Sequence, residues 1–286
     1  MGTQTAPLDV QRFLVPKTGS SPEECEDAID VSLSPDASSL FAAVSDGASE
    51  SLLAGAWARQ LVHGAVASMA AADGRRGDGE GSRSESFVED LLARTVGQWD
   101  GYIAEYQAER EARGRPITWY EQPGLDKGAF ATLVAVHIRA ASVDPEEPEA
   151  ARGWTWHAFA LGDSCLLHLR EGRLITSFPI ADGGGFGITP QLLGSCNQDA
   201  ALITDRASTA TGELRADDEL LLATDALAAW LLSRSEIDSG GTGKQLGMLA
   251  DLGDETFAEW VQSERDRSRM RNDDVALIRM RVKTEG

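Results

Sequence analysis

Short runs of apolar residues, separated by polar and glycine-containing turns, recur along most of the chain and predict β-strands. The predicted strands cover residues 12–16, 28–33, 40–45, 129–140, 154–162, 166–170, 173–179, 219–224 and 274–282. The run at 129–140 (AFATLVAVHIRA) is apolar at both alternating sets of positions, so we expect it to be covered on both faces. Its strand therefore belongs in the middle of a layered structure.

Apolar residues recur at helical spacing in several other stretches. Leu53, Trp57 and Leu61 predict a helix from about residue 50 to about residue 69. The other predicted helices cover residues 86–112, 226–233, 244–252 and 254–269. Residues 73–84 contain only glycine, serine and charged residues, which predicts an exposed loop. The stretch 182–211 begins rich in glycine and shows no regular pattern.

The order of these elements predicts one domain. No internal repeat is visible, and no shift in composition marks a linker. We expect the domain to span residues 11–283, with a loose tail at 1–10. It should contain two strand-rich layers, with one pair of helices between the first strands and the middle ones and another pair before the last strand.

The chain is strongly acidic, with 46 Asp and Glu residues against 26 Lys and Arg residues and a formal net charge of −20. This balance argues against nucleic-acid binding, which needs clustered basic residues to contact phosphates. It equally disfavours docking on an anionic membrane surface. Most of the charge is explained by solubility and does not locate a site.

The cysteine content and the lengths of the apolar runs predict the cellular location of the protein. Cys25, Cys165 and Cys196 are odd in number and widely spaced, so neither a disulfide framework nor a zinc site is expected. The first residues (MGTQTAPLDV) lack the pattern of a signal peptide. No run approaches the roughly 20 apolar residues that span a membrane. We expect a soluble, cytoplasmic protein.

Acidic residues stand where several predicted strands end or begin. Asp46, Asp163 and Asp225 each follow an apolar run, in LFAAVSDG, HAFALGDS and ELLLATDA, whereas Asp273 and Asp274 open the last run. In an antiparallel sheet the end of one strand lies beside the start of its neighbour, so these carboxylates are expected at one rim. Clustered carboxylates favour hard cations such as Mg²⁺ or Mn²⁺.

The acidic turns and their order resemble the metal-dependent serine/threonine protein phosphatases of the type 2C family. The resemblance runs from about Glu24 to Arg281 and rests on a conjunction of motifs: Glu26-Asp27-Ala28, Asp46-Gly47, GAFATLVAV, LGDS, LLLATDAL and the acidic start of the last strand. It is greatest for a bacterial branch that carries ATDALAAW. The family implies an α+β fold, a four-layer α-β-β-α sandwich of two stacked antiparallel sheets flanked by antiparallel helix pairs.

The resemblance also implies two Mn²⁺ or Mg²⁺ ions, with a possible third, and a metal-bridging hydroxide that hydrolyses phosphoserine or phosphothreonine. Transferred position by position, Asp46 bridges the ions through its carboxylate and Gly47 offers its carbonyl. Asp225 and Asp273 hold the first ion, Glu26 supports the second, and Asp163 with Asp225 defines a weaker third site. Asp27 and Asp274 lie around these ligands, with Asp274 at the family's Asn position. The implied partner is a phosphorylated protein, the product of a cognate serine/threonine kinase.

Two departures from the family pattern keep other functions open. Pro22 stands where the family has a phosphate-binding arginine, and Ala48 stands where some members have a histidine. Lys17 is the nearest basic residue before Pro22, and the sequence assigns no phosphate-binding residue. One alternative is a weak or inactive module that binds a phosphoprotein or a regulatory partner. Another is a metal-dependent hydrolase of a small phosphate ester.

Overall fold

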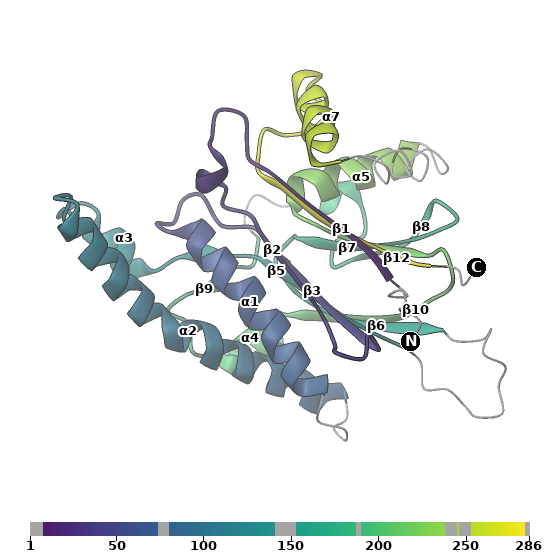
Figure 1. Cartoon of the computed structure of the whole chain (residues 1–286), viewed down its shortest axis with the longest axis horizontal. Helices are drawn as coiled ribbons and strands as arrows, with labels where there is room; N and C mark the ends of the chain where they lie inside the picture. Colours follow the sequence, from purple (N-terminus) through teal and green to yellow (C-terminus); the bar gives the residue numbers. More distant parts are fainter. Residues whose placement is uncertain are drawn as a thin grey trace, which may run out of the picture.

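The computed structural model describes residues 8–73, 80–140, 153–186, 190–237, 245 and 253–283. These residues form two five-stranded antiparallel sheets that are stacked face to face, with helices on both outer sides (Figure 1). The predicted α+β class and the four layers of the sandwich are confirmed.

The first sheet joins the two ends of the described chain. Its strands, in spatial order, are β1 (Leu8–Val15), β12 (Val275–Val282), β11 (Glu219–Ala223), β7 (Cys165–Arg170) and β8 (Arg173–Phe178). β1 and β12 pair along their whole length, from Leu8 opposite Val282 to Val15 opposite Val275. Since β1 begins at Leu8, residues 8–10 belong to the sheet and not to the predicted tail.

The second sheet holds the strands of the middle of the chain. Its spatial order is β10 (Ser208–Leu214), β6 (Trp154–Leu161), β5 (Leu133–Ala140), β3 (Ser39–Ser45) and β2 (Ala28–Leu33). The single strand predicted at 129–140 is divided at Thr132, because β4 (Phe130–Ala131) leaves the sheet and pairs with β9 (Leu193–Gly194). Every residue of β3 is buried.

Helices cover the outer faces of both sheets (Figure 1). The helices on the second sheet are α1 (Ala54–Asp73), α2 (Glu80–Ala112) and α4 (Ala200–Arg206), while α5 (Asp225–Ile237) and α7 (Asp254–Asp266) lie on the first sheet. The short α3 (Gln122–Lys127) and the 3-10 turns η1 (Pro22–Glu24) and η3 (Gly183–Gly185) lie in connecting segments. Among the described helices, none has the length and apolar content needed to cross a membrane.

Two predicted segments differ from the structure or fall outside it. The loop predicted at 73–84 is shorter, because α1 extends to Asp73 and α2 already begins at Glu80. The helix predicted at 244–252 lies outside the described residues, except for residue 245.

The core consists of three apolar layers. The central layer lies between the two sheets and includes Leu40, Val134, Leu222 and Ile278, each fully buried. The outer layers lie under the helices, where Trp57 of α1 packs on the second sheet. Full burial of a large apolar side chain contributes about 1.5–3 kcal/mol, so the two sheets form a rigid support for the residues at their rim.

Candidate metal centre

The strand register of the first sheet brings two of the predicted acidic residues together. Ala223, the last residue of β11, pairs with Cys165 on one side and Leu277 on the other. Asp163 lies two positions before Cys165, the first residue of β7, and Asp225 is the first residue of α5. Both carboxylates therefore lie at the same edge of this sheet. An acidic residue in the first turn of a helix is also favoured by the helix dipole.

The second sheet adds Asp46 from its own edge. Ser45, which ends β3, pairs with Ala28, which begins β2, so Asp46 lies beside Asp27. The backbone of Asp46 is fixed by Thr132: the Asp46 N–H donates to Thr132 Oγ1 at 3.1 Å, and the Thr132 N–H donates to the Asp46 carbonyl at 2.8 Å. Thr132 is the residue that interrupts β4 and β5, so the interruption serves to hold the Asp46 turn.

Asp46, Asp163 and Asp225 form one compact carboxylate cluster. Each offers an oxygen, and these three oxygens lie within 4.8 Å of one another. Among the described residues, this is the one group of three or more His, Cys, Asp or Glu side chains with such spacing. Oxygen ligands at this density are typical of sites for hard divalent cations.

Burial and mutual repulsion disfavour ionisation of the cluster. Burial, and then the charge of Asp225, raises the pKa of Asp163 to about 6. Burial followed by the charges of Asp225, Asp273 and Asp163 raises the pKa of Asp46 well above its usual value. The pKa of Asp225 is also raised, first by burial, although Arg271 opposes the shift. A bound cation would relieve this repulsion.

Two buried carboxylate oxygens at the site make no hydrogen bond to any described residue. They are Oδ1 of Asp163 and Oδ2 of Asp27, in side chains that belong to residues 5% and 2% exposed. Burial and then the charge of Asp46 raise the pKa of Asp27. A buried polar atom without a partner costs about 1–3 kcal/mol. The donor set and these two oxygens together fit a divalent cation.

Gly47 follows Asp46 at a position where no side chain fits. A Cβ atom there would lie 2.8 Å from the backbone carbon of Ala54 and 2.8 Å from the carbonyl oxygen of Glu26. The Gly47 N–H donates to that same carbonyl oxygen at 3.2 Å. Close backbone packing therefore requires glycine directly after Asp46.

Glu26 and Asp273 lie beside the three-carboxylate cluster and not within it. Oε2 of Glu26 accepts hydrogen bonds from Lys17 Nζ at 2.9 Å and from the hydroxyl of Ser49. Asp273 has a side chain that is 36% exposed, and its charge contributes to the raised pKa values of Asp46 and Asp225. Their assignment as metal ligands stays a prediction.

Asp274 is directed at the backbone and not at the cluster. Its Oδ1 accepts the N–H of Lys17 at 2.6 Å, and its Oδ2 accepts the N–H of Glu26 at 2.9 Å. The residue is only 4% exposed. Asp274 therefore holds the segment that carries Glu26.

The sequence reasoning overlooked a basic residue at the site, Arg271. Its Nη2 forms an ion pair with Oδ2 of Asp225, and its Nε lies 3.9 Å from Oδ2 of Asp273. The signal was present in the sequence, because Arg271 stands two positions before Asp273. Pro22, the position of the absent arginine, is an exposed residue at the start of η1.

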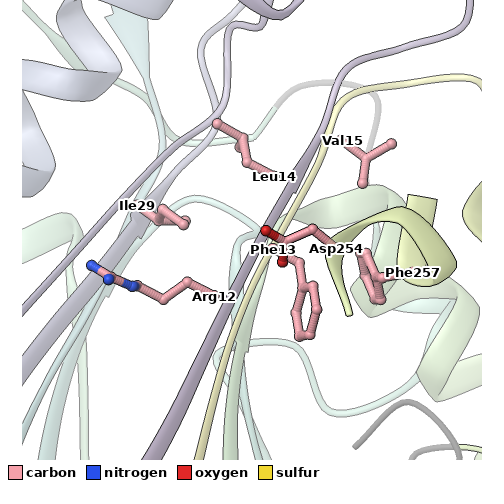
Figure 2. A pocket seen from close by; sticks show the side chains of 7 residues that line it. All are labelled: Arg12, Phe13, Leu14, Val15, Ile29, Asp254 and Phe257. Carbon is pink, nitrogen blue, oxygen red and sulfur yellow. The ribbon is translucent and has the colours of Figure 1, made fainter. Parts of the chain in front are cut away.

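A separate hollow lies on the outer edge of the sandwich. It has a volume of about 240 Å³ and is lined by Arg12, Phe13, Leu14, Val15, Ile29, Asp254 and Phe257. Figure 2 shows Arg12 and Ile29 on the side of β1 away from Phe257. No acidic residue of the predicted metal site lines it, so this hollow is distinct from the carboxylate cluster.

The sequence matches no protein-family model and no curated protein. Solved structures do match it over nearly the full length. A phosphatase from Toxoplasma gondii superposes with a TM-score of 0.59 at 14% identity, covering 97% of this chain and 93% of its own. The serine/threonine phosphatase Stp1 from Staphylococcus aureus gives 0.52 at 15% identity, with coverages of 98% and 96%.

A third match is the catalytic domain of the serine/threonine protein phosphatase PstP in complex with two manganese ions. It gives a TM-score of 0.51 at 16% identity and covers 97% of this chain and 99% of the PstP chain. The two stacked antiparallel sheets with flanking helices are shared by all three. The chain thus has the fold of the type 2C serine/threonine protein phosphatases, as the order of its acidic turns predicts.

Proposed function

We propose that the protein is a metal-dependent phosphatase that removes phosphate from phosphoserine and phosphothreonine in proteins. The observation that carries this proposal is the cluster of Asp46, Asp163 and Asp225, whose oxygens lie within 4.8 Å of one another. Carboxylates so crowded and so buried are costly unless a cation balances them, and hard divalent cations suit oxygen ligands. The fold of solved serine/threonine phosphatases gives the cluster its functional context.

The proposed ligands are the three clustered carboxylates, the Gly47 carbonyl, Asp273 and Glu26, holding two Mn²⁺ or Mg²⁺ ions with room for a third. Divalent ions in such a site supply a nucleophile at neutral pH and neutralise the oxygens of the phosphoryl group. The chain itself fixes the ligands: Thr132 holds the backbone of Asp46, and Asp274 holds that of Glu26. Fixed ligands avoid reorganisation during the reaction.

The proposed substrate is a cytoplasmic phosphoprotein, the product of a cognate serine/threonine kinase. One observation favours the alternative of a weak or inactive phosphoprotein-binding module, namely Pro22 at the position of the expected arginine. The carboxylate cluster opposes that alternative, because a protein that binds no metal gains nothing from confining repulsive charges. The third possibility, a hydrolase of small phosphate esters, differs from the main proposal only in its substrate.

The test is Mn²⁺-dependent phosphate release from a phosphothreonine peptide and from p-nitrophenyl phosphate. Both activities should be abolished in Asp46→Ala and Asp225→Ala. The matched control is Asp205→Ala, which removes an exposed acidic residue of α4, a helix on the outer side of the second sheet, and should leave activity unchanged.

Two other results would each favour one of the alternative functions over the proposed one. Activity on p-nitrophenyl phosphate alone, across a panel of phosphopeptides, would favour the small-ester hydrolase. A folded protein that is inert with Mn²⁺ and Mg²⁺, and whose melting temperature does not respond to either ion, would favour the binding module.

A further inference from the structure

We propose that Arg271 is the cation that binds the phosphate group of the substrate, and that it pairs with Asp225 until a metal ion takes over that carboxylate. This inference rests on the proposed phosphatase function and names the residue that would replace the basic group missing at Pro22. It also makes Arg271 a competitor of the metal for Asp225.

The position of Arg271 supports this role. Its guanidinium contacts Asp225 through Nη2 and approaches Asp273 Oδ2 to 3.9 Å through Nε. The side chain remains 55% exposed, so the guanidinium contacts the carboxylate cluster and is also accessible from solvent. Arginine presents its donors as a planar fork that matches two oxygens of a phosphate group.

The backbone on both sides of Arg271 is anchored. Met270 is 5% exposed and packs in the apolar layer between the first sheet and its helices. Asn272 Oδ1 accepts the N–H of Thr18 at 2.8 Å. Because both neighbours are held, the guanidinium stays near the cluster when it leaves Asp225. Such preorganisation is what a phosphate-binding group needs.

The charge of Arg271 acts on the whole cluster. Its guanidinium pairs with Asp225 and also approaches Asp273, so one cation balances part of the negative charge of two carboxylates at the site. Without metal, Arg271 therefore supplies part of the positive charge that the cluster lacks. A metal ion held by Asp225 would supply that positive charge in its place and would free the guanidinium of Arg271.

Lys17 is another basic side chain beside the site, and its contacts suit phosphate binding less well than those of Arg271. Its Nζ lies 2.9 Å from Oε2 of Glu26 and 3.3 Å from Oγ of Ser49, and its side chain is 29% exposed. Two donors of this ammonium group are already engaged by the segment that carries Glu26. A lysine also offers a point charge and not a fork.

The experiment compares Arg271→Gln with Arg269→Gln. Arg269→Gln removes the same charge from the same loop. The guanidinium of Arg269 lies 3.7 Å from Glu264 and not at the cluster. Calorimetric titration with Mn²⁺ should show several-fold tighter binding to Arg271→Gln, because the competing guanidinium is gone. Inhibition by inorganic phosphate should weaken about tenfold or more, and KM should rise by a similar factor with a smaller change in kcat. Arg269→Gln should match the wild type.

Arg271→Lys keeps the charge and loses the fork, so it should give an intermediate phosphate affinity; a melting curve confirms that each variant is folded. Unchanged phosphate inhibition and KM in Arg271→Gln would overturn the inference. So would a loss of phosphate affinity in Lys17→Gln in place of Arg271→Gln.

The inference about Arg271 can also be tested if the proposed phosphatase activity is absent. If the wild type binds Mn²⁺ but hydrolyses no phosphate ester, calorimetry of the Mn²⁺-loaded protein with inorganic phosphate replaces the kinetics. Phosphate binding that is present in the wild type and lost in Arg271→Gln then supports the inference without any catalysis. Equal phosphate binding by the two proteins, or binding by neither, overturns it.

Discussion

Asp274 accepts the backbone N–H of Glu26 at 2.9 Å, across 248 positions of the sequence. The same carboxylate accepts the N–H of Lys17 at 2.6 Å. One buried acidic residue at the start of the last strand thus fixes the segment that carries Glu26 and its partner Lys17. Metal ligands are commonly held by such a surrounding layer of hydrogen bonds.

Replacing Asp274 should therefore loosen this segment. Asp274→Ala leaves two N–H donors without their acceptor and should lower the free energy of unfolding by about 2–4 kcal/mol. Asp274→Asn keeps one acceptor oxygen and should cost less. Urea unfolding of the metal-free variants measures both effects. Wild-type stability in Asp274→Ala would show that the two hydrogen bonds contribute nothing.

Gly47 should tolerate no side chain. In Gly47→Ala the new Cβ would lie 2.8 Å from backbone atoms of Ala54 and Glu26, so the backbone must shift. We expect a loss of about 1–3 kcal/mol, as for other overpacked sites, together with weaker Mn²⁺ binding. The matched control is Gly97→Ala in α2, where a Cβ meets no atom within 4 Å. That control should gain about 0.5–1 kcal/mol, because alanine favours the helix. Thermal unfolding and Mn²⁺ titration of both variants check this contrast.

The sequence pattern predicted the buried strands well, because a strand face that is covered by another layer must carry apolar residues. The strand predicted at 28–33 has the same bounds as β2. The acidic residues at 46, 163, 225, 273 and 274 were predicted to share one rim, and the structure brings the first three together, whereas Asp274 binds backbone N–H groups. Local burial and turn chemistry were sufficient for both predictions.

The pattern of apolar residues did not predict a strand whose residues are mostly exposed, because such a strand has no apolar alternation. β10 (Ser208–Leu214) lies at the edge of its sheet, and most of its residues are exposed, so STATGEL carries little apolar alternation. The division of 129–140 depends on Thr132, whose backbone and hydroxyl bind Asp46 from another strand. The pair of Arg271 with Asp225 spans 46 positions and depends on the fold alone. Nearness to Asp273 in the sequence places Arg271 at the site, but its pairing with Asp225, like the contacts of Thr132, has no local signal.

The metal-free protein should gain stability from Asp163 as pH falls from 7 to 4. Its carboxyl has a pKa of about 6 in the folded protein, against 3.8 for an unperturbed group. The folded state therefore binds the proton more tightly than the unfolded state, and this stabilisation is complete below pH 4 and lost above pH 6. The difference is on the order of 3 kcal/mol.

Asp163→Asn should flatten that part of the pH profile. Unfolding of the wild type and the variant in EDTA, between pH 4 and pH 7, measures the difference. With saturating Mn²⁺ the wild-type trend should reverse, because protons then compete with the metal. Identical profiles of the two metal-free proteins would contradict the raised pKa of Asp163.

Asp218, a buried acidic residue outside the carboxylate cluster, should contribute to stability and not to activity. Asp218 is 1% exposed and accepts hydrogen bonds from Arg170 Nη2 at 2.7 Å, His168 Nε2 at 3.0 Å and the Arg215 N–H at 2.9 Å. Burial alone would raise the pKa of Asp218, but these donors outweigh it and lower the pKa. Asp218→Asn breaks a buried ion pair and should cost about 3–5 kcal/mol.

Because Asp218 lies outside the carboxylate cluster, kcat and Mn²⁺ affinity of the folded Asp218→Asn variant should equal those of the wild type. Thermal unfolding and kinetics at a temperature well below the midpoint separate the two effects. A loss of activity without a loss of stability would indicate a functional coupling between this network and the cluster.

Asp46 should stabilise the protein with metal and destabilise it without metal. Burial and the charges of Asp225, Asp273 and Asp163 raise its pKa, so its ionised form at pH 7 is unfavourable in the metal-free protein. Asp46→Asn removes that charge at nearly constant shape, and the free energy of unfolding in EDTA should rise. Mn²⁺ at a hundred times its Kd should stabilise the wild type by about 2.7 kcal/mol and this variant hardly at all.

Calorimetric melting with and without Mn²⁺ measures both changes, with Asp205→Asn as the control that should alter neither. A metal-free Asp46→Asn protein less stable than the wild type, with an intact response to Mn²⁺, would mean that Asp46 holds the fold and not the metal.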